Sequence, residues 1–311
     1  MNRLNLKGVI PAVVLPMTTD YEPDIAAYKR YLDWVISQGP VALAINVDTG
    51  EGPHLSREER QRVLEAAVDM AAGRVSIIAG VGGPYTTAAI TAARDAKDIG
   101  ADAVLMFPIS VFQGEPLDPE VPYQYHKAVA DAVDIPQILF QLQPALGGIN
   151  YSHEALLKLI EIDIVVAIKE ASFDAVRFRQ TKAVLAQAPR KITFLTGNDN
   201  LLLESYVLGA EGALIGFGTI ATDLQVQMYH AWFNHDFEEA FRLAAIVQPL
   251  SDAIFAPPVR NYRARTKEAF VMMGILNSAV VRPPLLPISD AERADLRRAL
   301  AKARLLEPVA A

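Results

Sequence analysis

The chain has 311 residues, 51% of them hydrophobic and 21% charged, and its 29 basic and 36 acidic side chains give a net charge of -7. This length and hydrophobic share suit one large α/β barrel, and the acidic balance argues against nucleic acid as a partner. The absence of cysteine excludes disulfides, thiolate nucleophiles and Cys-ligated metal sites. No apolar run reaches about 18 residues and no signal-peptide pattern is present, so we expect a soluble cytoplasmic protein with no membrane partner.

Short β-branched apolar runs alternate with longer segments of helical period through the first part of the chain. The expected strands are Val9–Leu15, Ala42–Val47, Val75–Val81, Ala103–Phe107, Gln137–Phe140, Val165–Ile168, Ile192–Leu195 and Ala213–Ile215. Helices are expected between them, over Ser56–Ala71, Thr86–Ile99, Pro119–Val133, Phe173–Ala188 and Asn198–Leu208. Eight strands that alternate with helices predict an α/β fold, a (β/α)8 TIM barrel with a parallel sheet.

Helix ends and strand composition support the barrel. Ser56 stands three residues before Glu59, as in a capping box, and Gly100 follows a predicted helix. Strands such as Ala42–Val47 are apolar at nearly every position, so both of their faces must be covered. No glycine-rich phosphate turn follows Leu15, which disfavours the dinucleotide-binding form of an open α/β sheet.

After about residue 235 the alternation of strands and helices stops. Three helices are expected there, over Asp236–Leu250, Asn261–Leu276 and Asp290–Leu305, separated by prolines. We therefore expect a barrel that carries the active site over residues 1–235 and a C-terminal helical extension packed on it over residues 236–311.

Lys169 is the first candidate for chemistry, because catalytic groups of such barrels lie at the C-terminal ends of the strands. It follows the apolar residues of the predicted sixth strand directly. Burial there would lower the pKa of the amine and make the neutral nucleophile available. On the residues alone, an edge lysine paired with Glu170 is an equally good interpretation.

Two further segments follow predicted strands. The turn Asn46–Gly52 offers backbone amides and a hydroxyl that can hold a carboxylate, although a plain connecting turn would have the same composition. The segment Phe140–Pro144 follows the fifth strand and by itself resembles an ordinary loop. The five histidines have no metal-ligand spacing, so we expect no metal.

Short motifs in a fixed order carry a resemblance that runs through most of the chain. They are Gly8-Val-Ile-Pro-Ala12, Asp48-Thr-Gly-Glu51, Ser56-Arg-Glu-Glu-Arg60, Gly80-Val-Gly-Gly83, Gly100-Ala-Asp-Ala-Val104, Pro136-Gln-Ile-Leu139, Ile168-Lys-Glu-Ala-Ser172, Gly197-Asn-Asp199 and Gly209-Ala-Glu-Gly-Ala213. Together they resemble the dihydrodipicolinate synthase and N-acetylneuraminate lyase family of class I Schiff-base aldolases.

The resemblance implies a mechanism and a set of site residues. Lys169 occupies the position of the family's imine-forming lysine, Thr49 and Gly50 match its carboxylate-binding turn, and Leu214 falls where the family has an apolar residue near the bound keto acid. Such enzymes need no cofactor, and they are commonly homotetramers built as dimers of dimers. We carry both properties over as expectations.

Departures from the family pattern bear on the substrate. Asp48 replaces a hydroxyl in the carboxylate turn, and Phe140 replaces the family's proton-shuttling tyrosine. A second family tyrosine, shared between subunits, aligns with Ser110 or its neighbours. No arginine lies near Ala145–Gly147, where dihydrodipicolinate synthases hold a second carboxylate, while Gln141 is similar to a glutamine of some sugar-acid dehydratases of the superfamily.

These observations predict a lyase, an aldolase or dehydratase, that acts through Lys169 on a 2-keto acid. They favour a 2-keto-3-deoxy sugar acid and disfavour dihydrodipicolinate synthase itself. Proton transfer would then fall to Asp48, Glu51 or an ordered water. The alternative is a catalytically silent paralogue that binds a small metabolite. A phosphate-binding barrel is a third interpretation, for which Gly216-Phe-Gly218 offers only a fragment of the required turn.

Overall fold

A parallel barrel forms the centre of the computed structural model, which describes residues 4–306. Its eight strands lie in the order β1-β8-β7-β6-β5-β4-β3-β2. Their bounds are β1 (Val9–Pro11), β2 (Ala42–Ile45), β3 (Ser76–Val81), β4 (Ala103–Met106), β5 (Gln137–Leu142), β6 (Val165–Ala171), β7 (Thr193–Thr196) and β8 (Gly212–Ile215). A parallel bridge between Ala12 and Ala44 joins the first two strands and closes the barrel. The expected (β/α)8 barrel is confirmed, and each expected strand is present.

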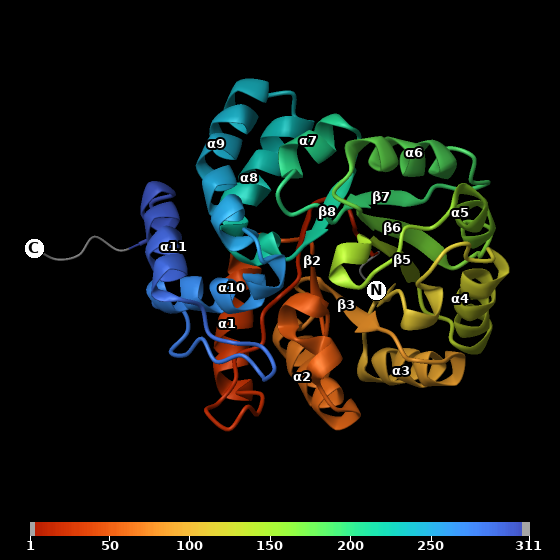
Figure 1. Ribbon diagram of the computed structural model, residues 1–311, viewed down its shortest axis with the longest axis horizontal. Helices are drawn as coiled ribbons and strands as arrows, with labels where there is room; N and C mark the ends of the chain where they lie inside the picture. Colours follow the sequence, from red (N-terminus) through yellow and green to blue (C-terminus); the bar gives the residue numbers. More distant parts are fainter. Residues whose placement is uncertain (1–3, 307–311) are drawn as a thin grey trace, which may run out of the picture.

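Helices surround the barrel as an outer ring (Figure 1). They are α1 (Ile25–Ser37), α2 (Arg57–Ala71), α3 (Thr86–Ile99), α4 (Glu120–Ala132), α5 (His153–Leu159), α6 (Ala175–Leu185), α7 (Leu202–Val207) and α8 (Thr222–Phe233). The capping box of Ser56 and Glu59 is present at the start of α2, and Gly100 ends α3 with a left-handed φ of 111°. Both of these local signals are confirmed.

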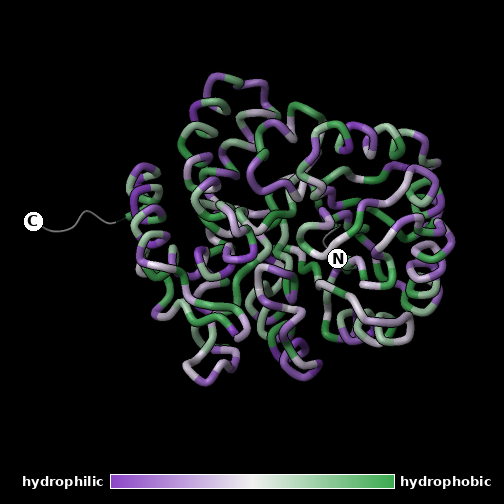
Figure 2. The backbone as a smooth tube through the Cα atoms, viewed as in Figure 1, coloured by the Kyte–Doolittle hydropathy of each residue, from purple (hydrophilic) through white to green (hydrophobic). Residues whose placement is uncertain are grey.

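The strands are apolar on both faces because each face is covered by a different part of the core. In β2, Ala42 and Ala44 belong to the cluster inside the barrel, while Leu43 and Ile45 belong to the larger cluster under the helices. Hydrophobic segments accordingly gather in the central strands, and hydrophilic ones lie on the outer turns (Figure 2). This arrangement leaves the strand ends as the place where polar side chains can enter the barrel.

Three helices follow the barrel, α9 (Phe237–Ile254), α10 (Tyr262–Met272) and α11 (Asp290–Lys302). They lie together on the side of the molecule that carries α1 and α8 (Figure 1), and α9 packs against both α8 and α11. The division into a barrel and an extension at residue 235 stays a prediction, and its outer ends, 1–3 and 307–311, lie outside the described residues. Within residues 4–306, no helix combines the length and hydrophobicity that a bilayer crossing requires.

Candidate active site

Lys169 lies on the inner face of the barrel near the C-terminal end of β6. Side chains alternate along a strand, and Ala167 and Ala171, two residues to either side, belong to the inner cluster. Glu170 points the other way and accepts hydrogen bonds from the backbone N–H of Ser172 and from Asn198, at 3.2 and 3.1 Å. The interpretation of Lys169 as an edge lysine paired with Glu170 therefore does not describe this structure.

The surroundings of Lys169 favour its neutral amine. Burial lowers the pKa of Lys169 to about 8, and attraction to Asp199 and Asp48 opposes this shift. The ammonium group lies 4.1 Å from the centre of the Phe140 ring, at the position where the family has a tyrosine. Burial raises the pKa of Asp199 to about 6, against the stabilising backbone N–H of Phe217 and the charge of Lys169. The site thus holds an amine and a carboxyl group that both titrate near neutral pH.

A cavity of about 40 Å³ adjoins Lys169 at the mouth of the barrel. Its wall is formed by strand ends, by the turn after β2 and by the start of α10. The residues are Ala12, Val47, Asp48, Thr49, Phe140, Leu142, Leu146, Lys169, Ala171, Phe173, Gly197, Asp199, Gly216, Phe255, Val259 and Tyr262. This volume is well below the several hundred Å³ of common ligand pockets, so it suits the reacting end of a small molecule.

Asp48 does not stand in the cavity as an isolated anion. Its carboxylate forms an ion pair with Arg263 and accepts a hydrogen bond of 2.9 Å from the hydroxyl of Tyr262. Arg263 also donates from Nε to the backbone oxygen of Asp48, at 2.7 Å. The negative charge of Asp48 is therefore balanced by the guanidinium of Arg263, which comes from α10.

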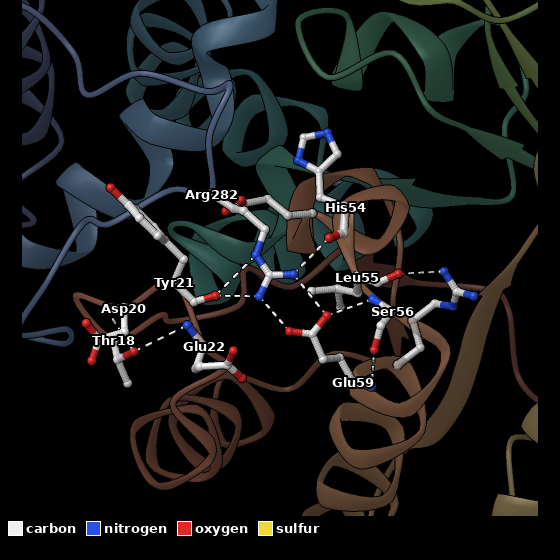
Figure 3. A network of polar contacts seen from close by, with 11 residues as sticks. Thr18, Asp20, Tyr21, Glu22, His54, Leu55, Ser56, Glu59 and Arg282 are labelled. Carbon is white, nitrogen blue, oxygen red and sulfur yellow. Dashed lines mark hydrogen bonds and ion pairs between the residues drawn. The ribbon is translucent and has the colours of Figure 1, made fainter.

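Glu51 belongs to a fully buried ion pair. Lys267 of α10 donates to Oε1 of Glu51 at 2.5 Å, and the backbone N–H of Arg282 donates to Oε2 at 2.8 Å. Figure 3 shows the guanidinium of Arg282 between the backbone oxygens of Tyr21 and His54 and the carboxylate of Glu59. These contacts bind the segments after β2 to the C-terminal part of the chain, and they occupy both oxygens of Glu51.

Close packing of the backbone keeps this part of the site in place. A Cβ atom at Gly52 would overlap the backbone of Asn46, so only glycine fits there. A Cβ atom at Gly216 would lie 2.9 Å from Oγ1 of Thr49, 3.3 Å from the Tyr262 ring and 3.4 Å from Oδ1 of Asp199. Three polar side chains from the β2 turn, the β7 end and α10 therefore meet above Gly216.

Some expected site residues do not meet Lys169. Gln141 was expected in a loop, but β5 continues to Leu142, and the alternation of the strand turns Gln141 outward. Its amide donates to Thr181 of α6 at 2.9 Å, and its oxygen accepts from the backbone of Tyr151 at 3.0 Å. Leu214 is fully buried in the inner cluster and is not part of the cavity wall.

Ser110 lines a different depression, a groove of about 580 Å³ between α2, α3 and the ends of β3 and β4. The groove is the larger of the two, but Lys169 does not border it. Two of its three charged groups, Arg57 and Asp95, form an ion pair with each other, with Nε and Oδ2 2.6 Å apart. We place the candidate active site at the smaller cavity, because it contains the buried amine.

Asp199, Tyr262 and Arg263 were missed as site residues. Asp199 had a signal, since it follows the seventh strand within the quoted motif Gly197-Asn-Asp199. Tyr262 and Arg263 had none, because they begin a helix beyond the barrel. Within residues 4–306, no three His, Asp or Glu side chains are grouped as metal ligands would be.

A TIM barrel with a buried lysine at its mouth is the architecture of class I aldolases. The sequence model of the dihydrodipicolinate synthetase family matches residues 5–303, and the chain belongs to this family. It is an enzyme of the lyase class, of the class I aldolase type.

The relatives agree in length and fold. The chain is 33% identical over 290 residues to the 4-hydroxy-tetrahydrodipicolinate synthase of Pelobacter propionicus, covering 93% of this chain and 96% of the relative. The dihydrodipicolinate synthase of Acinetobacter baumannii, solved with pyruvate, superposes with a TM-score of 0.86 at 30% identity, covering 97% and 100% of the two chains. YagE of E. coli K12, also solved with pyruvate, gives a TM-score of 0.87 at 25% identity and coverage of 96% and 99%.

Proposed function

We propose that the protein is a lyase that forms an imine between Lys169 and a 2-keto acid. One observation carries the proposal: the amine of Lys169 is buried in a cavity, and its pKa is lowered to about 8. A neutral amine is the form that attacks a carbonyl, and burial makes that form available near neutral pH. Two similar proteins were solved in complex with pyruvate, which supports a small 2-keto acid as the partner of the lysine.

The turn after β2 would hold the carboxylate of the keto acid. Thr49 lines the cavity and carries a hydroxyl, and its neighbour Gly50 would offer a backbone N–H. Because Arg263 pairs with Asp48, a second carboxylate can approach this turn without facing an unbalanced negative charge. The keto carbon would then lie toward Lys169.

The imine would act as an electron sink for the adjacent carbon atom. Once the nitrogen of Lys169 is bonded to C2 and water has left, electrons from a bond at C3 can move toward the positively charged nitrogen. This permits cleavage or formation of a carbon–carbon bond, or loss of a hydroxyl as water. Much of the cavity wall is buried, which limits the water around the reacting groups.

The substrate would differ from that of dihydrodipicolinate synthase. Phe140 brings no hydroxyl to the cavity, and Leu146 lines the wall in the segment where the family arginine is expected. The argument from Gln141 for a 2-keto-3-deoxy sugar acid loses its support, because that side chain faces α6. We therefore propose a 2-keto acid whose keto end fits the cavity, and a 2-keto-3-deoxy sugar acid remains one member of that class.

We further propose that the enzyme is cytoplasmic and assembles as a homotetramer, as the family resemblance implies. The groove that contains Ser110 lies where the resemblance places a residue shared between subunits. Light scattering at micromolar concentration should give a mass well above the 33.9 kDa of one chain. A strictly monomeric protein would contradict the assembly.

Trapping with borohydride tests the proposed function. The protein is incubated with pyruvate, 2-ketobutyrate or 2-keto-3-deoxygluconate plus borohydride, and intact mass and peptide mapping locate the reduced adduct. We expect the adduct on Lys169 and none in Lys169→Ala, while Lys182→Ala, which changes a lysine of α6, should be labelled like the wild type. An adduct that persists in Lys169→Ala, or no adduct with any of these keto acids, contradicts the proposal.

The alternative is a catalytically silent paralogue that binds a small metabolite, and it is favoured by the missing tyrosine at Phe140. Such a protein would bind keto acids without an adduct, or would form the adduct without turnover. Exchange of the C3 protons of the keto acid with deuterated water, followed by NMR, separates this outcome from an active lyase.

A further inference from the structure

Tyr262 and Phe140 both line the cavity. Tyr262 carries a phenol hydroxyl, whereas Phe140, at the position of the family tyrosine, carries none. Tyr262 is the first residue of α10 and lines the cavity together with Lys169. Its hydroxyl donates to Oδ2 of Asp48 at 2.9 Å and lies 3.3 Å from Oγ1 of Thr49. The phenol therefore joins two residues of the turn that would hold the substrate carboxylate.

The ring of Tyr262 is held in one place by its neighbours. It stacks on Phe255 with ring centres 5.0 Å apart and planes 19° from parallel. The guanidinium of Arg263 lies 5.1 Å from the ring centre, and the same group is bound to Asp48. A proton-transfer group needs such a fixed position, because its efficiency depends on geometry.

Tyr262 lines the same small cavity as Lys169. The ring of Tyr262 and Oδ1 of Asp199 both come within 3.4 Å of the position that a Cβ atom at Gly216 would take. The amine of Lys169 is attracted electrostatically by both Asp199 and Asp48, and all three residues line this cavity. Tyr262, hydrogen-bonded to Asp48, therefore borders the cavity that contains the reacting amine.

We propose that Tyr262, hydrogen-bonded to Asp48, is the catalytic residue that transfers protons during imine chemistry at Lys169. This inference rests on the proposed function of Lys169. It assigns to a residue of the C-terminal extension the role that a hydroxyl at position 140 would otherwise have.

Formation of the imine requires Tyr262 to give and take protons in turn. The lone pair of the Lys169 amine forms the N–C2 bond, and the carbonyl pair moves onto oxygen, which takes the phenol proton. The phenol oxygen then takes a proton from the positively charged nitrogen, which leaves a neutral carbinolamine. In the next step Tyr262 protonates the hydroxyl, water leaves, and the nitrogen lone pair forms the C=N bond of a charged imine.

The last step gives the enamine. The phenol oxygen takes a proton from C3, the C–H pair becomes the C2=C3 bond, and the C=N pair returns to nitrogen. In each step the phenol oxygen takes a proton only after it has given up its own, so the phenol is restored when the enamine forms. The 2.9 Å hydrogen bond to Asp48 holds the phenol oxygen in position throughout. Burial and the nearby charge of Asp48 raise the pKa of Tyr262, so its resting form is the proton donor.

Other candidate groups are less well placed for this role. Both oxygens of Glu51 are bound to Lys267 and to the backbone of Arg282. One oxygen of Asp199 accepts the backbone N–H of Phe217 at 2.7 Å. The Tyr262 hydroxyl, in contrast, is next to the Thr49 hydroxyl and the Asp48 carboxylate, which both lie in the turn after β2.

The test uses Tyr262→Phe in the full chain, with Tyr206→Phe as the matched control. Tyr206 is a buried tyrosine of α7 whose hydroxyl has no hydrogen-bond partner in the described structure, so its loss should leave activity unchanged. Each protein is incubated with pyruvate, or with 2-keto-3-deoxygluconate if that acid labels Lys169 better. Borohydride trapping shows whether the imine forms on Lys169, and NMR in deuterated water gives the rate of C3 exchange.

We expect Tyr262→Phe to retain the adduct and a KM within a few-fold of the wild type, while C3 exchange slows at least about a hundredfold. A slowing of less than about tenfold overturns the inference. Should Tyr262→Phe fail to fold, 3-fluorotyrosine at position 262 carries the same test, because it keeps the hydroxyl but lowers the pKa of the phenol. An unchanged rate and pH profile of C3 exchange in that protein would overturn the inference. Absence of the adduct in the wild type would instead contradict the proposed function of Lys169.

Discussion

The two sides of the cavity wall differ in how they are built. On one side, Lys169 and Asp199 stand at the ends of β6 and β7, where the barrel itself directs side chains inward. On the other side, Tyr262 and Arg263 come from α10, a helix beyond the barrel that binds the turn after β2. The first side depends on strand position alone, whereas the second depends on how a helix docks. The comparison shows that the buried amine of the candidate site comes from the barrel, whereas the charge balance of the site comes from a helix that follows the barrel.

The largest effect should come from the strand-end side. Lys169→Met should reduce lyase activity to the uncatalysed background, because no other amine lines the cavity within the described residues. At pH 7 it should also raise the free energy of unfolding, on the order of 1–3 kcal/mol, since a buried charge is removed. Activity assays and thermal unfolding would measure both changes, and residual turnover in this variant would contradict the role of Lys169.

The size of this stability change depends on pH. The folded pKa of Lys169, about 8, lies below its ordinary value of 10.5, so between these values the unfolded chain binds more protons and wild-type stability rises with pH. Below about pH 8 both states are charged and the full penalty is present. The stability gain of Lys169→Met should therefore disappear by about pH 10.

On the α10 side, the largest effect should come from the buried ion pair. Lys267→Met leaves Glu51 charged without its buried partner, so we expect a loss of about 3–5 kcal/mol in the free energy of unfolding. Arg298→Met, which removes an exposed pair with Asp295, should cost less than about 1 kcal/mol. Equal losses in the two variants in urea titrations would show that α10 does not hold the turn in the way we describe.

Loss of the charge balance at Asp48 should weaken substrate binding. Arg263→Leu leaves the carboxylate of Asp48 unpaired beside the place proposed for the substrate carboxylate, so KM for the keto acid should rise about 10- to 100-fold. Arg260→Leu, at an exposed position in the preceding turn, serves as the control. An unchanged KM in Arg263→Leu would mean that the carboxylate binds elsewhere.

The pH dependence of imine formation should report the charge of Lys169. Below a pKa of about 8 the neutral fraction falls tenfold per pH unit, so the rate at low keto-acid concentration should rise with pH and level off above about 8. Asp199→Asn removes a charge that raises this pKa, and the inflection should move to lower pH. A shift to higher pH would show that Asp199 does not act on Lys169 through its charge.

The smallest effect is expected at the family's missing tyrosine. Phe140→Tyr alone should leave condensation of pyruvate with aspartate semialdehyde near background, because it supplies a hydroxyl but no guanidinium near Ala145–Gly147. Phe140→Leu, which removes the ring beside the amine, is the matched change at the same position. Efficient condensation by Phe140→Tyr would refute our proposal that the natural substrate differs from that of dihydrodipicolinate synthase.

The sequence by itself determined the barrel and the position of the candidate nucleophile. Runs of apolar residues and the helical period between them are local signals, so the eight strands, the cap at Ser56 and the position of Lys169 could be predicted. The inward direction of Lys169 follows from the period of two along β6. Gln141 shows the limit of prediction from local signals. The fifth strand is two residues longer than expected, and its alternation turns the Gln141 side chain away from the cavity and toward α6.

Only the tertiary structure decided which residues complete the site. Glu51 and Lys267 are 216 positions apart in the chain, and Asp48 and Tyr262 are 214 apart. No periodicity connects such positions, because their contact depends on where α10 docks against the turn after β2. The charge of Asp48 could be predicted from the sequence, but its neutralisation by Arg263 and its hydrogen bond to Tyr262 could not, since docking brings these partners together.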